Sequence, residues 1–131
     1  MTAKTLDETD SLLLRHEFEC VELVDKATGI ALFEEDFYGE PQSGLIDSNN
    51  LWAAIGGTHL TVWCSGELRR IETIKDIDSI RLRKQNLVEI LTDPWSSESA
   101  IWELDLETFE FKKTKAFKAY QGKPFTENVK W

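Results

Sequence analysis

The sequence contains few of the residues that form disulfide frameworks and metal sites. Its two cysteines, Cys20 and Cys64, fall short of the four or more that a disulfide-stapled chain of this length usually carries. A structural zinc site usually takes four ligands, and the two histidines, His16 and His59, stand at none of the known motif spacings. We therefore expect no disulfide framework, no metal and no cofactor, and a reducing, cytoplasmic location.

Long apolar runs are also missing. The longest such run is only a handful of residues, against the roughly 20 that a helix needs to cross a bilayer. The chain opens on polar and acidic residues instead of the basic and then apolar segments of a signal peptide. Its 131 residues, 41% of them hydrophobic, are about one domain's worth. We therefore expect a soluble single domain over residues 1–131 with no membrane partner.

Basic residues are scarce in the first 50 positions. Twelve acidic residues stand against three basic ones there, which accounts for the whole net charge of −9. Nucleic acids are bound by clusters of Lys and Arg, so we expect no nucleic acid partner. A basic protein partner fits better, because opposite charges steer association. The alternative is that the acidity only keeps the protein soluble.

Apolar and polar residues alternate with a period of two over most of the chain, which indicates strands. The clearest hairpins cover residues 16–33, 51–64 and 102–111, and their turns contain the Gly, Asp and Thr that tight turns favour. Residues 40–50 are rich in turn-forming residues and indicate a loop. The region from residue 16 to residue 114 is therefore predicted to be an antiparallel meander.

These patterns predict a mainly β fold, with about eight short strands that form a curved sheet, an open barrel or a sandwich. Residues 1–15 are expected to form an arm or a short helix, because Thr5 and Glu8 fit a capping box. Residues 115–131 are expected to form a C-terminal tail. The spacing of Phe117 and Tyr120 favours a minor helix there.

A loose repeat relates residues 51–68 to residues 87–109. The offset is 36 residues between the leucines that open the two segments and 39 between their tryptophans. This spacing resembles the blade period of a β-propeller, about 40 residues. A closed propeller needs at least four blades, on the order of 160 residues, which this chain does not have. We interpret the repeat as a regular recurrence of hairpins, which is compatible with a curved sheet, an open barrel or a sandwich.

No pattern in the sequence indicates catalysis. Cys64 and His59 are the nearest approach to a nucleophile and its base, but an extended strand would separate them by roughly 16 Å at about 3.3 Å per residue. Cys64 continues an apolar alternation, which predicts a small buried side chain. Gly56 and Gly57 lack the following helix and Lys-Ser/Thr pair of a phosphate-binding loop and suit a hairpin turn. We therefore expect a protein without enzymatic activity.

Besides the basic tail (Lys112, Lys113, Lys115, Lys118, Lys123 and Lys130), which is most simply a solvated terminal segment, two segments are candidates for partner binding. In the first, acidic residues surround two aromatic ones, and its candidate contact residues are Glu34, Glu35, Asp36, Phe37, Tyr38 and Glu40. Acidic side chains attract a basic partner, and an aromatic ring anchors it once water is excluded. The second candidate is Trp95, in a polar loop. The alternative in both cases is that the aromatic side chains pack inward and the acidic ones are merely solvated.

The function that these features favour is a non-enzymatic protein-binding module. Its most specific form is an acidic immunity-type inhibitor that neutralises a basic bacterial toxin by filling its substrate groove. Two alternatives belong to other classes. One is a small β-barrel that binds an apolar or aromatic ligand, with Trp52, Trp63 and Trp102 lining the cavity. The other is a structural subunit that pairs with its own copy through an exposed strand edge.

Overall fold

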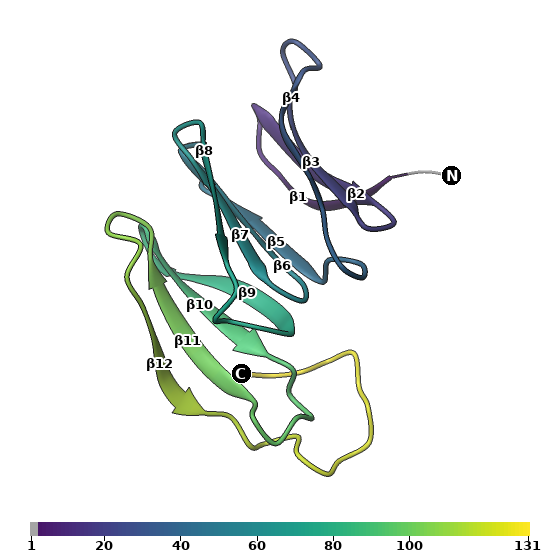
Figure 1. Cartoon of the computed structure of the whole chain (residues 1–131), viewed down its shortest axis with the longest axis vertical. Coiled ribbons are helices and arrows are strands. Elements are labelled where there is room, and N and C mark those ends of the chain that lie inside the picture. Colours follow the sequence, from purple (N-terminus) through teal and green to yellow (C-terminus); the bar gives the residue numbers. More distant parts are fainter. Residues whose placement is uncertain (1–2) are drawn as a thin grey trace.

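Strands account for all the regular secondary structure of the region that the computed structural model describes, residues 3–131 (Figure 1). No helix is found in this range, and hence none that is long and apolar enough to cross a membrane. The twelve strands are β1 (Lys4–Glu8), β2 (Leu12–Glu17), β3 (Cys20–Asp25), β4 (Ala31–Asp36), β5 (Ser43–Ile46), β6 (Trp52–Gly56), β7 (Leu60–Cys64), β8 (Glu67–Ile71), β9 (Ile77–Lys84), β10 (Leu87–Thr92), β11 (Ala100–Asp105) and β12 (Phe111–Ala116).

The strands form three sheets of four, and each sheet is a simple antiparallel meander. The first sheet contains β1–β4, the second β5–β8 and the third β9–β12, with the strands of each sheet in sequence order. Figure 1 shows the three sheets side by side in a row, with the second between the other two, like consecutive blades that do not close a ring. The prediction of a mainly β antiparallel meander is confirmed. The strands number twelve instead of about eight, and no closed barrel forms from them.

Two hydrophobic clusters hold the three sheets together, one on each face of the second sheet. The cluster toward the first sheet contains Leu12, Leu14, Val21, Leu23, Phe33, Phe37, Ile46, Ala53 and Ile55. The cluster toward the third sheet contains Trp52, Ala54, Leu60, Val62, Ile74, Ile77, Ile80, Val88, Ile90, Leu104 and Leu106. The second sheet is therefore covered on both faces, which explains why every residue of β6 is buried.

The three tryptophans proposed for a ligand cavity do not share one. Trp52 and Trp102 belong to the cluster between the second and third sheets, whereas Trp63 packs against the cluster on the other face. Trp52 is 2% exposed and lies within the packed core. The barrel arrangement therefore does not form, because the sheets stack face to face and bury these aromatic side chains between them.

Two glycines lie where neighbouring sheets pack closely against each other. A Cβ atom on Gly44 of β5 would lie 2.6 Å from Leu14 Cδ2 in the first sheet. A Cβ atom on Gly56 of β6 would lie 2.4 Å from Ile77 Cγ2 at the start of the third sheet. The second sheet therefore contacts both of its neighbours through backbone that carries no side chain.

The expected arm or short helix at residues 1–15 is instead a hairpin. Residues 1 and 2 lie outside the described region, and β1 and β2 pair antiparallel from Lys4 to His16. Leu12, Leu14 and His16 are buried in alternation, so the pattern of a half-buried strand outweighs the capping-box signal at the start of the chain.

Two further elements differ from the predictions. Residues 40–50 contain the short strand β5, which pairs with the buried strand β6. The predicted strand that begins at residue 16 is two strands, because Phe18 adopts a φ of 53° in a tight turn between β2 and β3. A bulky residue rarely takes such a φ, so no sequence signal marked this turn.

The C-terminal tail forms turns and no helix. β12 extends to Ala116, and Phe117 and Tyr120 stack with their ring centroids 5.9 Å apart in the turns that follow. The chain then returns to the third sheet (Figure 1), and a backbone oxygen of Trp131 accepts a hydrogen bond from Arg81 there. Contact between aromatic side chains, without a helix, thus accounts for the spacing of Phe117 and Tyr120.

The loose sequence repeat corresponds to equivalent strands of two sheets. Residues 51–68 include β6, β7 and the start of β8, and residues 87–109 include β10 and β11, which occupy the same positions in the third sheet. The repeat therefore reflects one four-stranded sheet followed along the chain by another.

Candidate functional site

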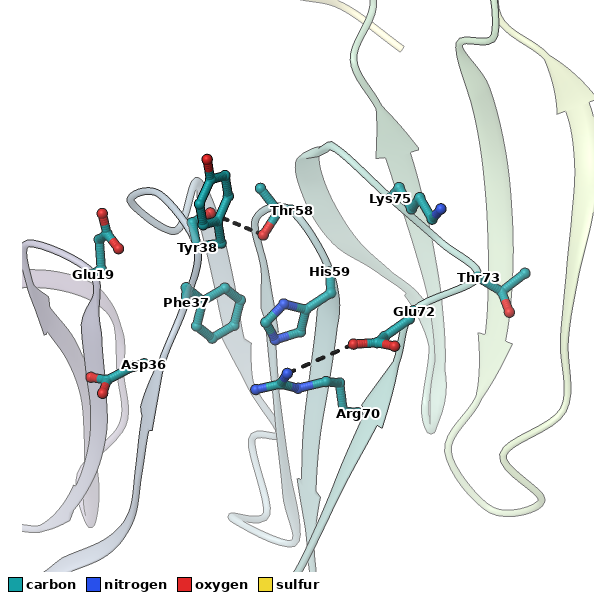
Figure 2. Close-up of a pocket in the computed structure, with 10 residues that line it drawn as sticks. All are labelled: Glu19, Asp36, Phe37, Tyr38, Thr58, His59, Arg70, Glu72, Thr73 and Lys75. Carbon is teal, nitrogen blue, oxygen red and sulfur yellow. Dashed lines mark hydrogen bonds and ion pairs between the residues drawn. The ribbon is translucent and has the colours of Figure 1, made fainter.

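A cleft of about 930 Å³ opens where the end of β4 meets the edge of the second sheet. Figure 2 shows its lining side chains, among them Asp36, Phe37 and Tyr38 from the first sheet and its following segment, and His59 and Arg70 from the second sheet. The cleft is thus a junction between two sheets, and the first predicted partner-binding segment forms one of its walls.

Glu35 of β4 links the first sheet to the second through its carboxylate. Its Oε1 atom lies 2.9 Å from His59 Nε2, accepts a hydrogen bond of 2.9 Å from Thr61 Oγ1 and forms an ion pair of 2.8 Å with Arg70 Nη2. A carboxylate oxygen can only accept, so His59 donates through Nε2. The Glu35 side chain is 8% exposed. One carboxylate of β4 therefore holds three side chains of the second sheet.

The aromatic residue that follows β4 reinforces this junction. Phe37 is 2% exposed, and its ring stacks on the imidazole of His59 with the centroids 4.2 Å apart and the planes at 14°. Thr58 Oγ1 donates a hydrogen bond of 3.0 Å to the backbone carbonyl of Tyr38. The backbone of residues 35–38 is therefore fixed against the second sheet.

Tyr38 points the other way. Its side chain is 86% exposed, and Figure 2 shows the ring directed away from Phe37 and His59. The ring lies beside a second depression of about 400 Å³, which also receives Glu40 and Trp95. The structure therefore brings the two candidate segments together, because Tyr38 borders the first cleft and shares the second depression with Trp95.

The candidate residues of the acidic segment separate into two groups. Glu35 and Phe37 face the junction, whereas Glu34, Asp36, Tyr38 and Glu40 are exposed. Alternation along β4 explains why Glu34 and Glu35 lie on opposite faces. Trp95 is half-buried: it contacts Phe125 at a centroid distance of 5.1 Å, and its Nε1 atom is buried without a hydrogen-bond partner in the described part of the chain.

Sequence analysis did not place His59, Arg70 or Phe125 at this surface. His59 was considered only as a base for Cys64 and as a metal ligand, and Phe125 lies in the predicted C-terminal tail, outside the pair of aromatic residues that favoured a minor helix. The pairing of sheets brings the first two to the cleft, and the return of the tail brings Phe125 to Trp95. Those contacts join residues far apart in the sequence, so no local sequence pattern predicts them.

The two cysteines lie outside this surface and are both free thiols. Cys64 packs against the core cluster between the second and third sheets, but it is half-buried where its alternation predicted a buried side chain. Cys20 is exposed, and its thiol pKa is raised by partial burial and then by the negative charge and hydrogen bond of Asp36, with smaller effects from Glu34 and Glu22. A raised pKa lowers the thiolate fraction, so Cys20 is a weak nucleophile.

Within residues 3–131, no three His, Cys, Asp or Glu side chains are grouped as ligands of a metal ion. Comparison with family models and with curated proteins gives no match to this chain. The arrangement of the side chains is therefore the basis for any functional proposal.

Proposed function

We propose that this chain is a non-enzymatic module that binds a basic protein through a surface centred on Tyr38. The observation that carries the proposal is the setting of this side chain, which is 86% exposed between two depressions. Acidic residues outnumber basic ones in their linings by seven to two: Glu19, Asp36, Glu40, Glu72, Asp76, Asp78 and Asp93 against Arg70 and Lys75.

This setting combines the two properties that a docking surface for a basic protein needs. Carboxylates around the rim attract positive charge over a distance and raise the rate of association. An exposed tyrosine presents a large, stiff ring that loses little conformational freedom when it is buried, and such residues carry much of the energy at protein interfaces. The tight junction below, at Glu35 and Phe37, holds the backbone of Tyr38 in place before the partner arrives.

The ionisable side chains near the cleft support binding more than catalysis. Glu35 Oε1 already interacts with three side chains, and His59 is stacked on Phe37. These contacts join two sheets, which is a structural role. The thiol of Cys20, with its raised pKa, is not an activated nucleophile.

The most specific form of the proposal is an immunity-type inhibitor of a basic bacterial toxin that acts in the cytoplasm. Two free thiols support a reducing compartment. The acidic surface around Tyr38 supports a target whose own groove is positively charged, as the substrate groove of a nuclease is. Blocking such a groove requires no chemistry from the inhibitor.

The proposal is tested by capturing partners on the immobilised protein from a lysate of its source cells, at about 0.1 M and about 0.5 M salt. A basic protein retained at the lower salt should bind Tyr38→Ala at least about tenfold more weakly, because an interface anchor is worth about 2 kcal/mol or more. Asp36→Asn should weaken binding and reduce its salt dependence. Ile30→Ala, an exposed apolar residue after the β3 strand, and Asp10→Asn, in the β1–β2 turn, are the matched controls.

Retention of a basic protein by Tyr38→Ala with unchanged affinity would place the interface elsewhere. If no basic protein is retained, the mass of the protein in solution becomes the next measurement. A mass that rises with concentration would then favour the self-associating subunit.

A further inference from the structure

The depression beside Tyr38 is lined by aromatic and acidic side chains, together with Gln42, Thr58, Ile77 and two glycines. Its aromatic side chains are Tyr38, Trp95 and Phe125, and its acidic ones include Asp76, Asp78 and Asp93. We call these six residues the acidic aromatic pocket. Glu40 adds a fourth carboxylate at its edge, and none of the described residues that line it is Lys, Arg or His.

The aspartates are held close together by the backbone. Asp93 N–H donates a hydrogen bond of 2.7 Å to the carbonyl of Asp76, and Ile77 N–H donates one of 2.7 Å to the carbonyl of Gly57. These bonds fix the start of β9 to the turn after β6 and to the loop after β10. The three aspartates are therefore placed by the fold at one end of the third sheet, where the turn after β6 of the second sheet joins it.

Within residues 3–131, none of the three aspartates forms an ion pair with a basic side chain. Asp78 accepts a hydrogen bond from Ser79 Oγ, and Asp93 accepts one from the backbone N–H of Trp95. In residues 3–131, the ion pairs involve other acids, such as Glu22, Glu35, Glu89 and Glu103, and none includes an aspartate of this pocket. Like charges in proximity repel, so a bound cation would relieve that repulsion.

The aromatic rings favour a cation of a particular shape. Phe125 is 74% exposed, its ring centroid lies 5.1 Å from that of Trp95, and the exposed side chain of Tyr38 lines the same depression. A planar guanidinium stacks on aromatic faces and is weakly hydrated, whereas an ammonium is a compact, strongly hydrated charge. Aromatic faces combined with carboxylates are therefore better suited to arginine than to lysine.

The same chain already contains an arginine bound in this way. The guanidinium of Arg81 lies 3.9 Å from the ring centroid of Trp131, and its Nε donates a hydrogen bond of 2.9 Å to Glu89. Arg69 lies 4.2 Å from the ring centroid of Phe109. The acidic aromatic pocket offers the partners that Arg81 has, a ring and a carboxylate, without an arginine of its own.

We propose that the acidic aromatic pocket binds an arginine side chain that projects from the basic partner. This inference rests on the proposed function and specifies where the partner is recognised. The guanidinium would lie against the aromatic rings, and its N–H groups would donate to the aspartates, which can accept two parallel hydrogen bonds. Tyr38 would then contact the segment of the partner beside that arginine.

The test uses the whole protein and three blocked peptides, Gly-Gly-Xaa-Gly-Gly, with Arg, Lys or Gln at the centre. Each is added to ¹⁵N-labelled protein up to about 10 mM, well above a millimolar Kd, while the indole N–H signal of Trp95 is followed by NMR. The Arg peptide should shift this signal in a saturable way and bind at least about threefold more tightly than the Lys peptide. The Gln peptide should leave it unchanged.

Two variants locate the binding. Phe125→Ala removes an exposed ring and should weaken binding of the Arg peptide about two- to fivefold, since an exposed cation–π contact is worth about 0.5–1 kcal/mol. Asp78→Asn should weaken it by a similar factor and reduce its dependence on salt. Glu110→Gln, an exposed acid before β12, is the matched control and should have no effect.

The results also separate this inference from the proposed function. Absence of a saturable shift with the Arg peptide, or equal binding of the Lys or Gln peptide, would overturn the arginine site. If in addition the captured partner loses affinity in Tyr38→Ala but not in Phe125→Ala or Asp78→Asn, the protein-binding function stands without this pocket. If the partner is insensitive to all three variants, both proposals are wrong.

Discussion

The imidazole of His59 lies flat against the ring of Phe37, with the ring centroids 4.2 Å apart and the planes at 14°. The same imidazole interacts with Glu35 through Nε2 at 2.9 Å. One side chain of the second sheet therefore engages two residues of the first sheet that stand two positions apart. Because side chains alternate along an extended chain, this arrangement turns Asp36 and Tyr38 outward, where they form the proposed docking surface.

Glu35→Ala should lower the free energy of unfolding by about 2–4 kcal/mol, because hydrogen bonds to a charged group are worth about 1.5–3 kcal/mol and Arg70, His59 and Thr61 would lose their shared acceptor. Urea unfolding followed by tryptophan fluorescence measures this change. Glu34→Ala is the control on the opposite face of β4 and should stay within about 0.5 kcal/mol. Equal costs for the two variants would contradict the role assigned to Glu35.

Gly56→Ala should lower the free energy of unfolding by about 1–3 kcal/mol, because the added Cβ would lie 2.4 Å from Ile77 Cγ2 and the second and third sheets would have to shift. Ile77→Ala removes the crowded Cγ2 and Cδ1 atoms and leaves only Cβ, which would lie 2.9 Å from the added atom. The cost of Gly56→Ala should therefore be smaller by about 1 kcal/mol or more in the Ile77→Ala background. Additive costs in this double-mutant cycle, measured by urea unfolding, would show that the two residues do not interact.

Asn86 has two roles that substitutions can separate. It adopts a φ of 62° in the β9–β10 turn, and its Oδ1 accepts a hydrogen bond of 3.1 Å from Trp52 Nε1. Asn86→Gly keeps the backbone conformation but loses the acceptor for Trp52 and the hydrogen bond that Asn86 Nδ2 donates to Glu107, and should cost about 1–2 kcal/mol. Asn86→Ala should cost about 1 kcal/mol more, because alanine is strained at this φ. Thermal unfolding of both variants tests the difference. Identical unfolding midpoints would show that the positive φ at residue 86 adds no cost for alanine.

Sequence pattern predicted the β class, and the hairpins at residues 51–64 and 102–111, because alternation and turn residues act locally. It did not predict the turn at Phe18 or the strand β5, since neither carries the residues that normally mark such elements. Pairing with β6, a contact made by tertiary structure, is what makes residues 43–46 a strand.

The candidate site was predictable only in part, for the same reason. Acidic and aromatic residues at positions 34–40 indicated a surface, but only the stacking of sheets decides that Phe37 is buried on His59 while Tyr38 is exposed. Tyr38, Trp95 and Phe125 are far apart in the sequence, and only the folded chain brings them to one depression. Charge counts indicated an acidic half without showing that Asp76, Asp78 and Asp93 contribute to the same surface.

Cys20 provides a test of the acidic environment at the end of β4. Its thiol pKa is raised by partial burial and by Asp36, Glu34 and Glu22, so at pH 8 the folded protein should react with iodoacetamide more slowly than the unfolded chain. Asp36→Asn removes the largest charge contribution. The pKa should fall, the thiolate fraction at pH 8 should rise, and alkylation should become faster.

Peptide mapping by mass spectrometry follows Cys20 separately from Cys64 in this experiment. Asp10→Asn, an exposed acid in the β1–β2 turn, is the control and should leave the rate at Cys20 unchanged. The alkylation rates of Cys20 in Asp36→Asn and in the unaltered protein should converge as the pH rises, because the Cys20 thiol becomes fully ionised in both proteins. If Asp36→Asn reacts no faster at pH 8, the carboxylate is not close enough to Cys20 to act on it, and the placement of Asp36 at the rim of the cleft would have to be revised.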